Sequence, residues 1–258
     1  MKITQQNVES LHVVNGLVAR SCSGFRADNG RVIEAFLEPL MFLILWGMIY
    51  STGIIEADIS KKLLVINLIW ATSASIQKQA SLSFMYDVWS REFTELLRAG
   101  VKPAQYLCAV LAFGVLAGVV IVVLYCLLSP FIFRIDLETA WIAAKLLPAL
   151  VVCGLTVSCF GVGVVLRYSQ LYGFVASVIL QVMVLLANPF VPRESLPTWW
   201  QWAHIGIPFT WVFEAVRTGA TGEVIAAYIL SFLWFGISIY FYFWMFRIAR
   251  RDGRLGRI

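Results

Sequence analysis

The sequence predicts an all-α membrane protein with six transmembrane helices, an interfacial amphipathic helix before them, and short broken helices between spans five and six. Of the 258 residues, 60% are hydrophobic, whereas a soluble domain is about 45–50% apolar. The mean hydropathy is +0.81. Apolar runs of roughly 20 residues, long enough to cross a bilayer as a helix, recur along the chain. Lipid is therefore expected to solvate much of the surface.

Residues 1–30 form the first predicted unit, with an amphipathic helix over residues 4–28. Apolar side chains recur there every three or four positions, and polar or basic side chains fall between them. The apolar set is Val8, Leu11, Val14, Val18, Cys22 and Phe25. This pattern favours a helix that lies in the membrane interface. A helix packed on a soluble partner is the alternative.

Residues 31–250 form the predicted transmembrane domain, and residues 251–258 form a basic cytoplasmic tail. The six spans are expected at about 32–55, 63–85, 104–133, 141–166, 171–190 and 224–246. We expect Glu34, Glu38 and Pro39 at the start of the first span, because acidic residues and proline suit a helix N-terminus.

Two of the spans carry features beyond plain hydrophobicity. The second is the least apolar and holds several amide and hydroxyl side chains, so we expect it to line a cavity or pack against protein. The third contains Gly114 and Gly118, whose spacing favours close contact with another helix.

The distribution of basic residues predicts the orientation. With six spans, both termini share one side of the membrane. That side would hold fourteen of the twenty lysine and arginine residues, and the other side would hold only Lys61, Lys62, Arg134, Lys145, Arg193 and Arg217. Basic residues are enriched on the cytoplasmic side of membrane proteins. Both termini are therefore expected to be cytoplasmic.

The chain lacks the motifs of several catalytic classes. No GxxxxGK[ST] phosphate-binding loop occurs, and none of the six lysines follows a glycine. HExxH, GxSxG and paired cysteine or histidine clusters are absent as well. We therefore expect no catalytic residues, no bound cofactor and no metal in this chain.

The predicted cytoplasmic loop between spans two and three contains a short amphipathic helix. Phe93, Leu96 and Leu97 share one face, and charged side chains surround the rest. The charged set is Arg91, Glu92, Glu95 and Arg98. Gly100 and Pro103 are expected to end the helix. Such a helix suits docking into a groove of another protein. A solvated loop helix is the alternative.

The predicted outer segment, residues 188–222, is broken by prolines yet rich in aromatic residues. Tryptophans collect at membrane interfaces, and broken helices at that depth need protein or a water-filled cavity around them. Glu214 and Arg217 are three apart on one helical face and are expected to pair. We interpret the segment as an outer gate. The candidate gate residues are Pro197, Trp200, Pro208, Glu214 and Arg217. An aromatic belt that anchors a loop is the alternative.

These features together resemble the membrane subunit of type-2 ABC exporters, and the likeness covers most of the chain. The stretch Asn-Pro-Phe-Val-Pro-Arg-Glu-Ser-Leu-Pro-Thr-Trp-Trp-Gln (188–201), followed by Pro-Phe-Thr-Trp-Val-Phe-Glu-Ala-Val-Arg (208–217), is similar to the family's pattern before its last span. The run Arg-Glu-Phe-Thr-Glu-Leu-Leu (91–97) resembles the loop in which members carry Arg-Glu and a Leu-Leu pair.

The resemblance implies a half-transporter in a bacterial or archaeal cell (inner) membrane. Two membrane subunits, either two copies of this chain or this chain with a homologous permease, would form the pathway. Two copies of a separate ABC ATPase subunit, which bind ATP and Mg²⁺, would drive export. Residues 91–98 would be the coupling helix in the ATPase groove, and the N-terminal helix with Arg20 and Arg26 would touch the same subunit. Membrane lipid is an expected partner, and nucleic acid is not.

The substrate expected from the resemblance is amphipathic. A lipid-linked glycan, polysaccharide or lipid is favoured over a drug, because polar and aromatic residues mix in the second span. Five residues of the first two spans are candidates for the pathway, namely Trp46, Tyr50, Trp70, Gln77 and Phe84. Ordinary helix packing is the alternative role for each of them.

Other classes of membrane protein remain as alternatives. A secondary carrier should show an internal repeat, and none is visible. A membrane enzyme needs a convergent set of acid, base or metal ligands, and none is found. A membrane-embedded assembly protein without an ATPase partner is the further alternative.

Overall fold

The computed structural model describes residues 2–52, 56–133, 137–188, 191 and 195–253. Every regular element in these residues is helical, which confirms the all-α class. The helices are α1 (Lys2–Ala27), α2 (Asn29–Ser51), α3 (Ala57–Trp89), α4 (Glu92–Arg98), α5 (Pro103–Phe133), α6 (Leu137–Arg167), α7 (Val175–Ala187), α8 (Thr198–Ile205), α9 (Pro208–Thr218) and α10 (Thr221–Arg251), with a single 3₁₀ turn, η1 (Gln170–Tyr172), before α7.

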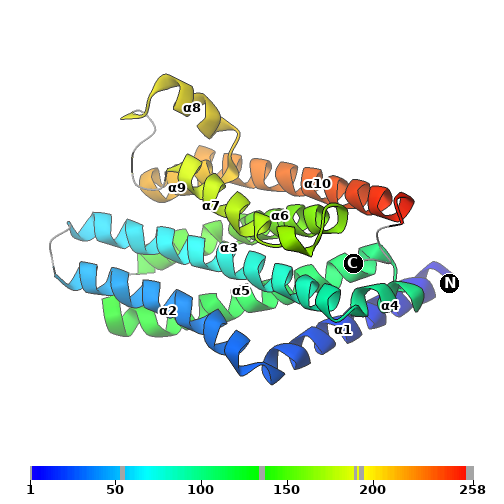
Figure 1. Ribbon diagram of the computed structural model, residues 1–258. Coiled ribbons are helices and arrows are strands. Elements are labelled where there is room, and N and C mark those ends of the chain that lie inside the picture. The colour runs from blue at the N-terminus through cyan, green and yellow to red at the C-terminus, as the bar shows by residue number, and fades with distance from the viewer. Residues whose placement is uncertain (1, 53–55, 134–136, 189–190, 192–194, 254–258) are drawn as a thin grey trace.

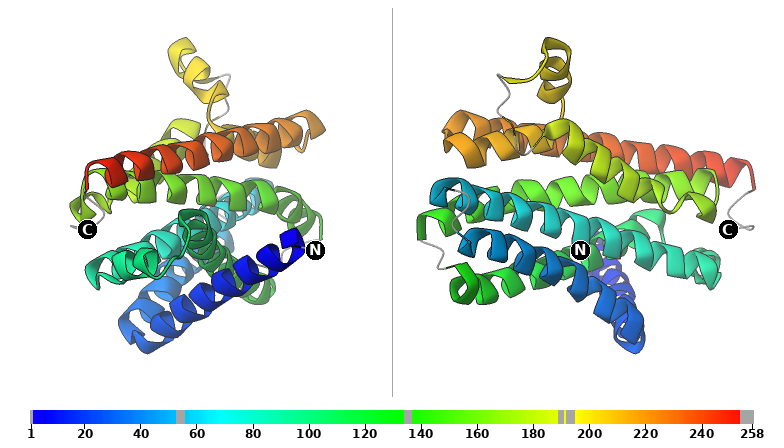
Figure 2. Two further views of the ribbon diagram at one scale, coloured as in Figure 1. Left: turned by 90° about the vertical axis from the view of Figure 1, so that its right-hand side faces the viewer. Right: turned by 60° about the vertical axis from the view of Figure 1, so that its left-hand side comes forward.

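The long helices run side by side in one bundle (Figure 1). The N-terminus, the end of α10 and the short helix α4 all lie at one end of this bundle, and the end of α2 and the start of α3 lie at the other. Helix α8 stands apart from the bundle in both views of Figure 2. The arrangement separates an end that carries α4 from an end that carries the broken segment α8–α9.

Among the residues that the structure describes, four helices are long and apolar enough to cross a membrane. They cover Asn29–Ile49, Pro103–Leu128, Trp141–Arg167 and Thr221–Arg251. Two of the six predicted spans are not among them. Helix α3 carries too many polar side chains along its 33 residues, and α7 has only 13 residues, which is about 20 Å of helix.

Helix α3 is the centre of the bundle and packs against α2, α5, α6 and α7. Its polar side chains are satisfied by protein groups. The Asn67 amide donates to the Tyr125 hydroxyl at 3.0 Å, and the Ser73 hydroxyl donates to the Leu150 carbonyl at 3.1 Å. A helix surrounded in this way keeps its polar groups away from hydrocarbon, where each unmade hydrogen bond is costly.

Glycines of the neighbouring helices allow α3 to approach closely. Ile76 fits against Gly114 and Gly118 of α5 and against Gly154 of α6. A Cβ atom at Gly114 would lie 2.8 Å from the Ile76 carbonyl oxygen, and one at Gly118 would lie 2.5 Å from Ile76 Cγ1. The predicted role of this glycine spacing in close helix contact is therefore confirmed.

The predicted start of the first span is wrong. Helix α2 begins at Asn29, so Pro39 lies inside the helix and no acidic residue occupies its first turn. Glu34 and Glu38 instead bind Lys78 of α3, at 2.9 and 2.8 Å. The two carboxylates are therefore stabilised by a lysine on a neighbouring helix rather than by the helix N-terminus.

Helix α1 lies obliquely along α5, to which it is joined by side-chain contacts. The Gln105 amide donates to the Ser10 hydroxyl at 3.1 Å, and the rings of Phe25 and Phe113 meet edge to face with centroids 6.0 Å apart. Leu17 is buried. The apolar stripe of this helix therefore covers other helices of the same chain over part of its length.

The close contact at Gly114 predicts that alanine is tolerated less well there than at a glycine with open space around it. Gly114→Ala should destabilise the protein by about 1–3 kcal/mol, because the new methyl group meets a backbone oxygen that cannot move aside. Gly236→Ala in α10 is the matched control, since nothing lies within 4 Å of its added Cβ and alanine favours a helix. Thermal unfolding in detergent tests this pair. Equal midpoints for the two variants would contradict the packing described.

Candidate functional site

Helix α4 is a short link between α3 and α5 at the end of the bundle that carries both termini (Figure 1). The chain turns into it at Arg91, whose φ of 63° is left-handed, and leaves it at Gly100, whose φ is 93°. Phe93 is completely buried, and its ring meets Phe84 at 5.4 Å and Tyr106 at 4.9 Å between centroids. The aromatic side chain therefore fixes α4 to the ends of α3 and α5.

The face of α4 that points away from the protein is charged. Leu96 and Leu97 are partly buried against the same core as Phe93, whereas the four charged residues Arg91, Glu92, Glu95 and Arg98 are exposed. Glu95 and Arg98 pair at 2.6 Å, with side chains 67% and 68% exposed. The predicted apolar face thus packs on the chain itself, and a partner would meet mainly the charged face.

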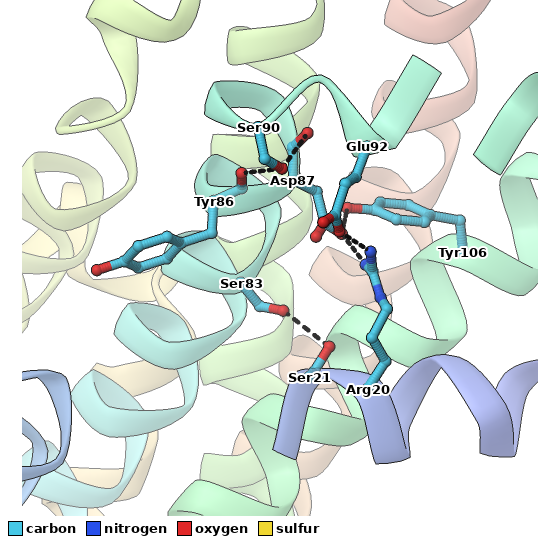
Figure 3. A network of polar contacts seen from close by, with 8 residues as sticks. All are labelled: Arg20, Ser21, Ser83, Tyr86, Asp87, Ser90, Glu92 and Tyr106. Atoms are coloured by element: carbon cyan, nitrogen blue, oxygen red, sulfur yellow. Dashed lines mark hydrogen bonds and ion pairs between the residues drawn. The ribbon is translucent and has the colours of Figure 1, made fainter. Parts of the chain in front are cut away.

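A buried carboxylate ties α4 to three other helices (Figure 3). Asp87, near the end of α3, accepts a hydrogen bond from the Tyr106 hydroxyl at 2.6 Å and forms an ion pair with Arg20 of α1 at 2.5 Å. The other Arg20 nitrogen binds the Glu92 carboxylate of α4. We call Arg20, Asp87, Glu92 and Tyr106 the Asp87 junction.

Burial and hydrogen bonding act in opposite directions on Asp87, which lies beyond the predicted second span. Burial raises the pKa of its carboxyl group, and the bonds from Tyr106 and Arg20 oppose this by favouring the charged form. The sequence offered one signal for this residue, an acidic side chain at the end of a polar helix, but gave no indication of its partners.

A cavity of about 450 Å³ lies between α2, α3 and α7. Its lining is amphipathic: the ion-paired Glu34, Glu38 and Lys78 accompany the amides of Gln77 and Gln181 and the rings of Phe42, Trp70, Trp89 and Phe174. Ion pairing within the lining offsets part of the cost of placing three charges beside apolar helices.

A second cavity of about 350 Å³ borders the first. Phe42, Trp70 and Gln181 line both cavities. Phe213 of α9 also lines the second. The two cavities therefore follow one side of α3 toward the broken segment.

The structure brings together three of the five candidate pathway residues. Trp46 lines the second cavity, Gln77 lines the first, and Trp70 lines both. Phe84 lies apart, because it is buried in the core beneath α4 and contacts Phe93, so its assignment to the pathway is wrong. The side chain of Tyr50 is outside the described part of the chain.

The candidate gate residues lie on two short helices. Pro197 precedes α8, and Pro208 is the first residue of α9. The Trp200 indole donates to the Leu186 carbonyl of α7 at 2.9 Å. Glu214 and Arg217 pair at 2.6 Å, as the sequence predicted, and Arg217 also donates to the Val191 carbonyl at 2.6 Å. The prolines at 189 and 192 of the motif lie outside the described residues.

Within the described ranges, no three histidine, cysteine, aspartate or glutamate side chains gather in a way that could hold a metal ion.

Comparison with known proteins identifies the family. A family model described as ABC-2 type transporter matches residues 13–221, which include α4, both cavities and the broken segment. No curated protein matches the chain significantly. Members of this family are permease subunits without an ATPase site of their own, and they generally pair with an ABC ATPase subunit. The chain belongs to the ABC-2 type transporter family and is a multi-pass transmembrane subunit of an ABC transporter.

Proposed function

We propose that this chain forms half of the pathway of an ATP-driven exporter. In this proposal it pairs with a second copy of itself or a homologous permease, and two copies of a separate ATPase subunit bind ATP and Mg²⁺. The observation that carries the proposal is α4, a helix with a core-bound apolar face and an exposed charged face at the end of the bundle that holds both termini.

The proposal requires six crossings with both termini cytoplasmic. The surroundings of α3 support a fifth crossing despite its polar sequence, because four helices cover it. Helix α7 supports the sixth crossing. Its 13 residues are mostly apolar, and they form a wall of the cavities that leads toward α8. The excess of basic residues near α4 and the termini supports the cytoplasmic orientation.

Coupling would follow from the way α4 is held. A motion of the ATPase that pushes α4 would reach α3 and α5 through Phe93, which is buried between them. The same motion would reach α1 through Arg20. Well-packed interiors transmit such displacements, because they have few voids in which a shift can be absorbed.

The two cavities are the proposed substrate route, with α8 and α9 as its outer gate. Their aromatic and amide lining suits an amphipathic substrate, because rings stack on the apolar faces of sugars or contact acyl chains while amides bind hydroxyl groups. A lipid-linked glycan, polysaccharide or lipid remains favoured over a drug. The inner membrane of a bacterium or archaeon is the proposed location.

Charge reversal at Glu95 tests the ATPase contact. Glu95→Lys should reduce the amount of ABC ATPase that co-purifies from native membranes roughly tenfold or more, because a reversed charge at an interface repels its former partner. The fold should persist, since exposed ion pairs contribute only about 0–1 kcal/mol.

Glu56→Lys is the matched control. Glu56 is also exposed and precedes α3 at the opposite end of the bundle. Loss of the ATPase in both variants, or retention in both, would argue against docking through α4.

Substitution of Trp70 tests the substrate route. A fluorescent alkyl glycoside should bind Trp70→Ala in nanodiscs about fivefold more weakly than the unaltered chain, in line with the loss of one aromatic contact. Trp244→Ala removes the same side chain from an exposed position on α10, away from both cavities, and should bind normally. Equal affinities of the two variants would contradict a pathway through these cavities.

A further inference from the structure

A third cavity of about 190 Å³ lies between α1, α2, α3 and α5. Its walls are mostly apolar, and they include Phe36 of α2 and Leu116, Ala117, Val120 and Ile121 of α5. Leu116 and Val120 are 47% and 44% exposed, so the cavity opens on the outer surface of α5. We call it the α1–α5 groove. Ala35, Ser75 and Gln79 line both this groove and the 450 Å³ cavity, but the groove extends along α5 and the cavity extends toward α7.

Helix lengths indicate where the groove lies in a bilayer. From Phe113 to the end of α5 at Phe133, and from Arg31 to the end of α2 at Ser51, each helix provides about 20 residues, or roughly 30 Å. Arg31 and Phe113 are in contact, with the guanidinium 5.4 Å from the ring centroid. The apolar residues beyond Phe113 lie within the candidate span Pro103–Leu128, so we place this part of the groove in the acyl-chain region and its arginine end toward the cytoplasmic headgroups.

The end of the groove at this boundary is basic. Arg26 is exposed and lines the groove. Arg31 is buried behind it, above the rings of Phe25, Tyr86 and Phe113, and donates to the Gln79 side-chain oxygen at 3.3 Å.

Three acidic side chains, Asp28, Asp87 and Glu34, act electrostatically on Arg31. Asp28 accepts bonds from the Tyr86 hydroxyl at 3.0 Å and from the Arg31 backbone N–H at 3.1 Å. The Arg31 N–H bond and the Tyr86 bond lower the pKa of Asp28, which stays ionised at neutral pH. Glu34 is paired with Lys78 and Asp87 with Arg20, and the exposed guanidinium of Arg26 can meet an anionic headgroup.

We propose that the α1–α5 groove binds one acyl chain of an anionic phospholipid from the cytoplasmic leaflet, with its phosphate on Arg26. The apolar part of the groove, which opens toward hydrocarbon, suits the acyl chain of such a lipid. The guanidinium at its end suits the phosphate. The void is too narrow for a helix of a partner protein, which is about 10 Å across. The proposal rests on the orientation proposed above and does not require an ATPase partner.

The position of the groove gives the lipid a route to α4. Helix α1 forms one wall, and the same helix carries Arg20, which binds Asp87 and Glu92. A lipid seated beneath α1 supports the helix that holds the Asp87 junction. The composition of the cytoplasmic leaflet would thereby act on the coupling end of the protein.

Native mass spectrometry of the full-length chain tests the site. We expect one phosphatidylglycerol molecule to be retained per chain, and phosphatidylcholine of the same acyl length to be retained more weakly. Arg26→Gln should lower the affinity for phosphatidylglycerol about fivefold and leave phosphatidylcholine unchanged. Arg250→Gln, which removes the same charge from an exposed position on α10, should change neither.

A second variant tests the apolar part of the groove. Ala117→Trp should fill it and abolish retention of both lipids, while the thermal unfolding midpoint stays near that of the unaltered chain. Equal retention of the two lipids, equal effects of Arg26→Gln and Arg250→Gln, or full retention in Ala117→Trp would each overturn the proposal. Loss of ATPase binding in Glu95→Lys with retained lipid would separate this site from the coupling surface.

Discussion

The attachment of α4 to the helix bundle depends on the buried carboxylate of Asp87. A carboxylate removed from water must be paired and hydrogen-bonded, or its burial is strongly destabilising. Asp87 meets this requirement through Tyr106 on one side and Arg20 on the other, and Arg20 also holds Glu92 (Figure 3). Four helices are thus fixed at one point, so α4 is part of a packed unit rather than a free loop.

The polar character of α3 serves two purposes. On the sides that face α5 and α6, its hydroxyl and amide groups bond to protein and Ile76 fits against three glycines. On the side that faces α2 and α7, Gln77 and Lys78 line a cavity. A plain apolar helix would pack as well but would offer no polar groups to a substrate. Because α3 leads into α4, the same helix links the cavity to the proposed coupling surface.

Much of the helical organisation was predictable from sequence, because runs of apolar residues, and the glycines, prolines and charged residues between them, determine where helices begin and end. The short helix after the second span was expected at 91–98 and is observed at Glu92–Arg98. Glu214 and Arg217 pair as their spacing suggested. In both cases the signal is local, since it depends on residues within one or two turns.

The errors concern contacts between distant segments. The amphipathic pattern of α4 identified an apolar face but not its neighbour, which is the chain's own core. Phe84 seemed a pathway residue because it is aromatic and lies on a polar helix, yet it packs beneath Phe93. The partner of Asp87 is separated from it by 67 positions, and no periodic pattern connects them.

The side of the membrane on which α4 lies is the most direct test of the central claim. Glu95→Cys and Glu56→Cys would be compared in a chain whose Cys22, Cys108 and Cys126 are replaced by serine, using a membrane-impermeant maleimide. We expect Cys at position 56 to react in intact cells, and Cys at position 95 to react only in inverted vesicles. Labelling of position 95 from outside intact cells would contradict a cytoplasmic coupling helix, and with it the proposed transmission of force from an ATPase.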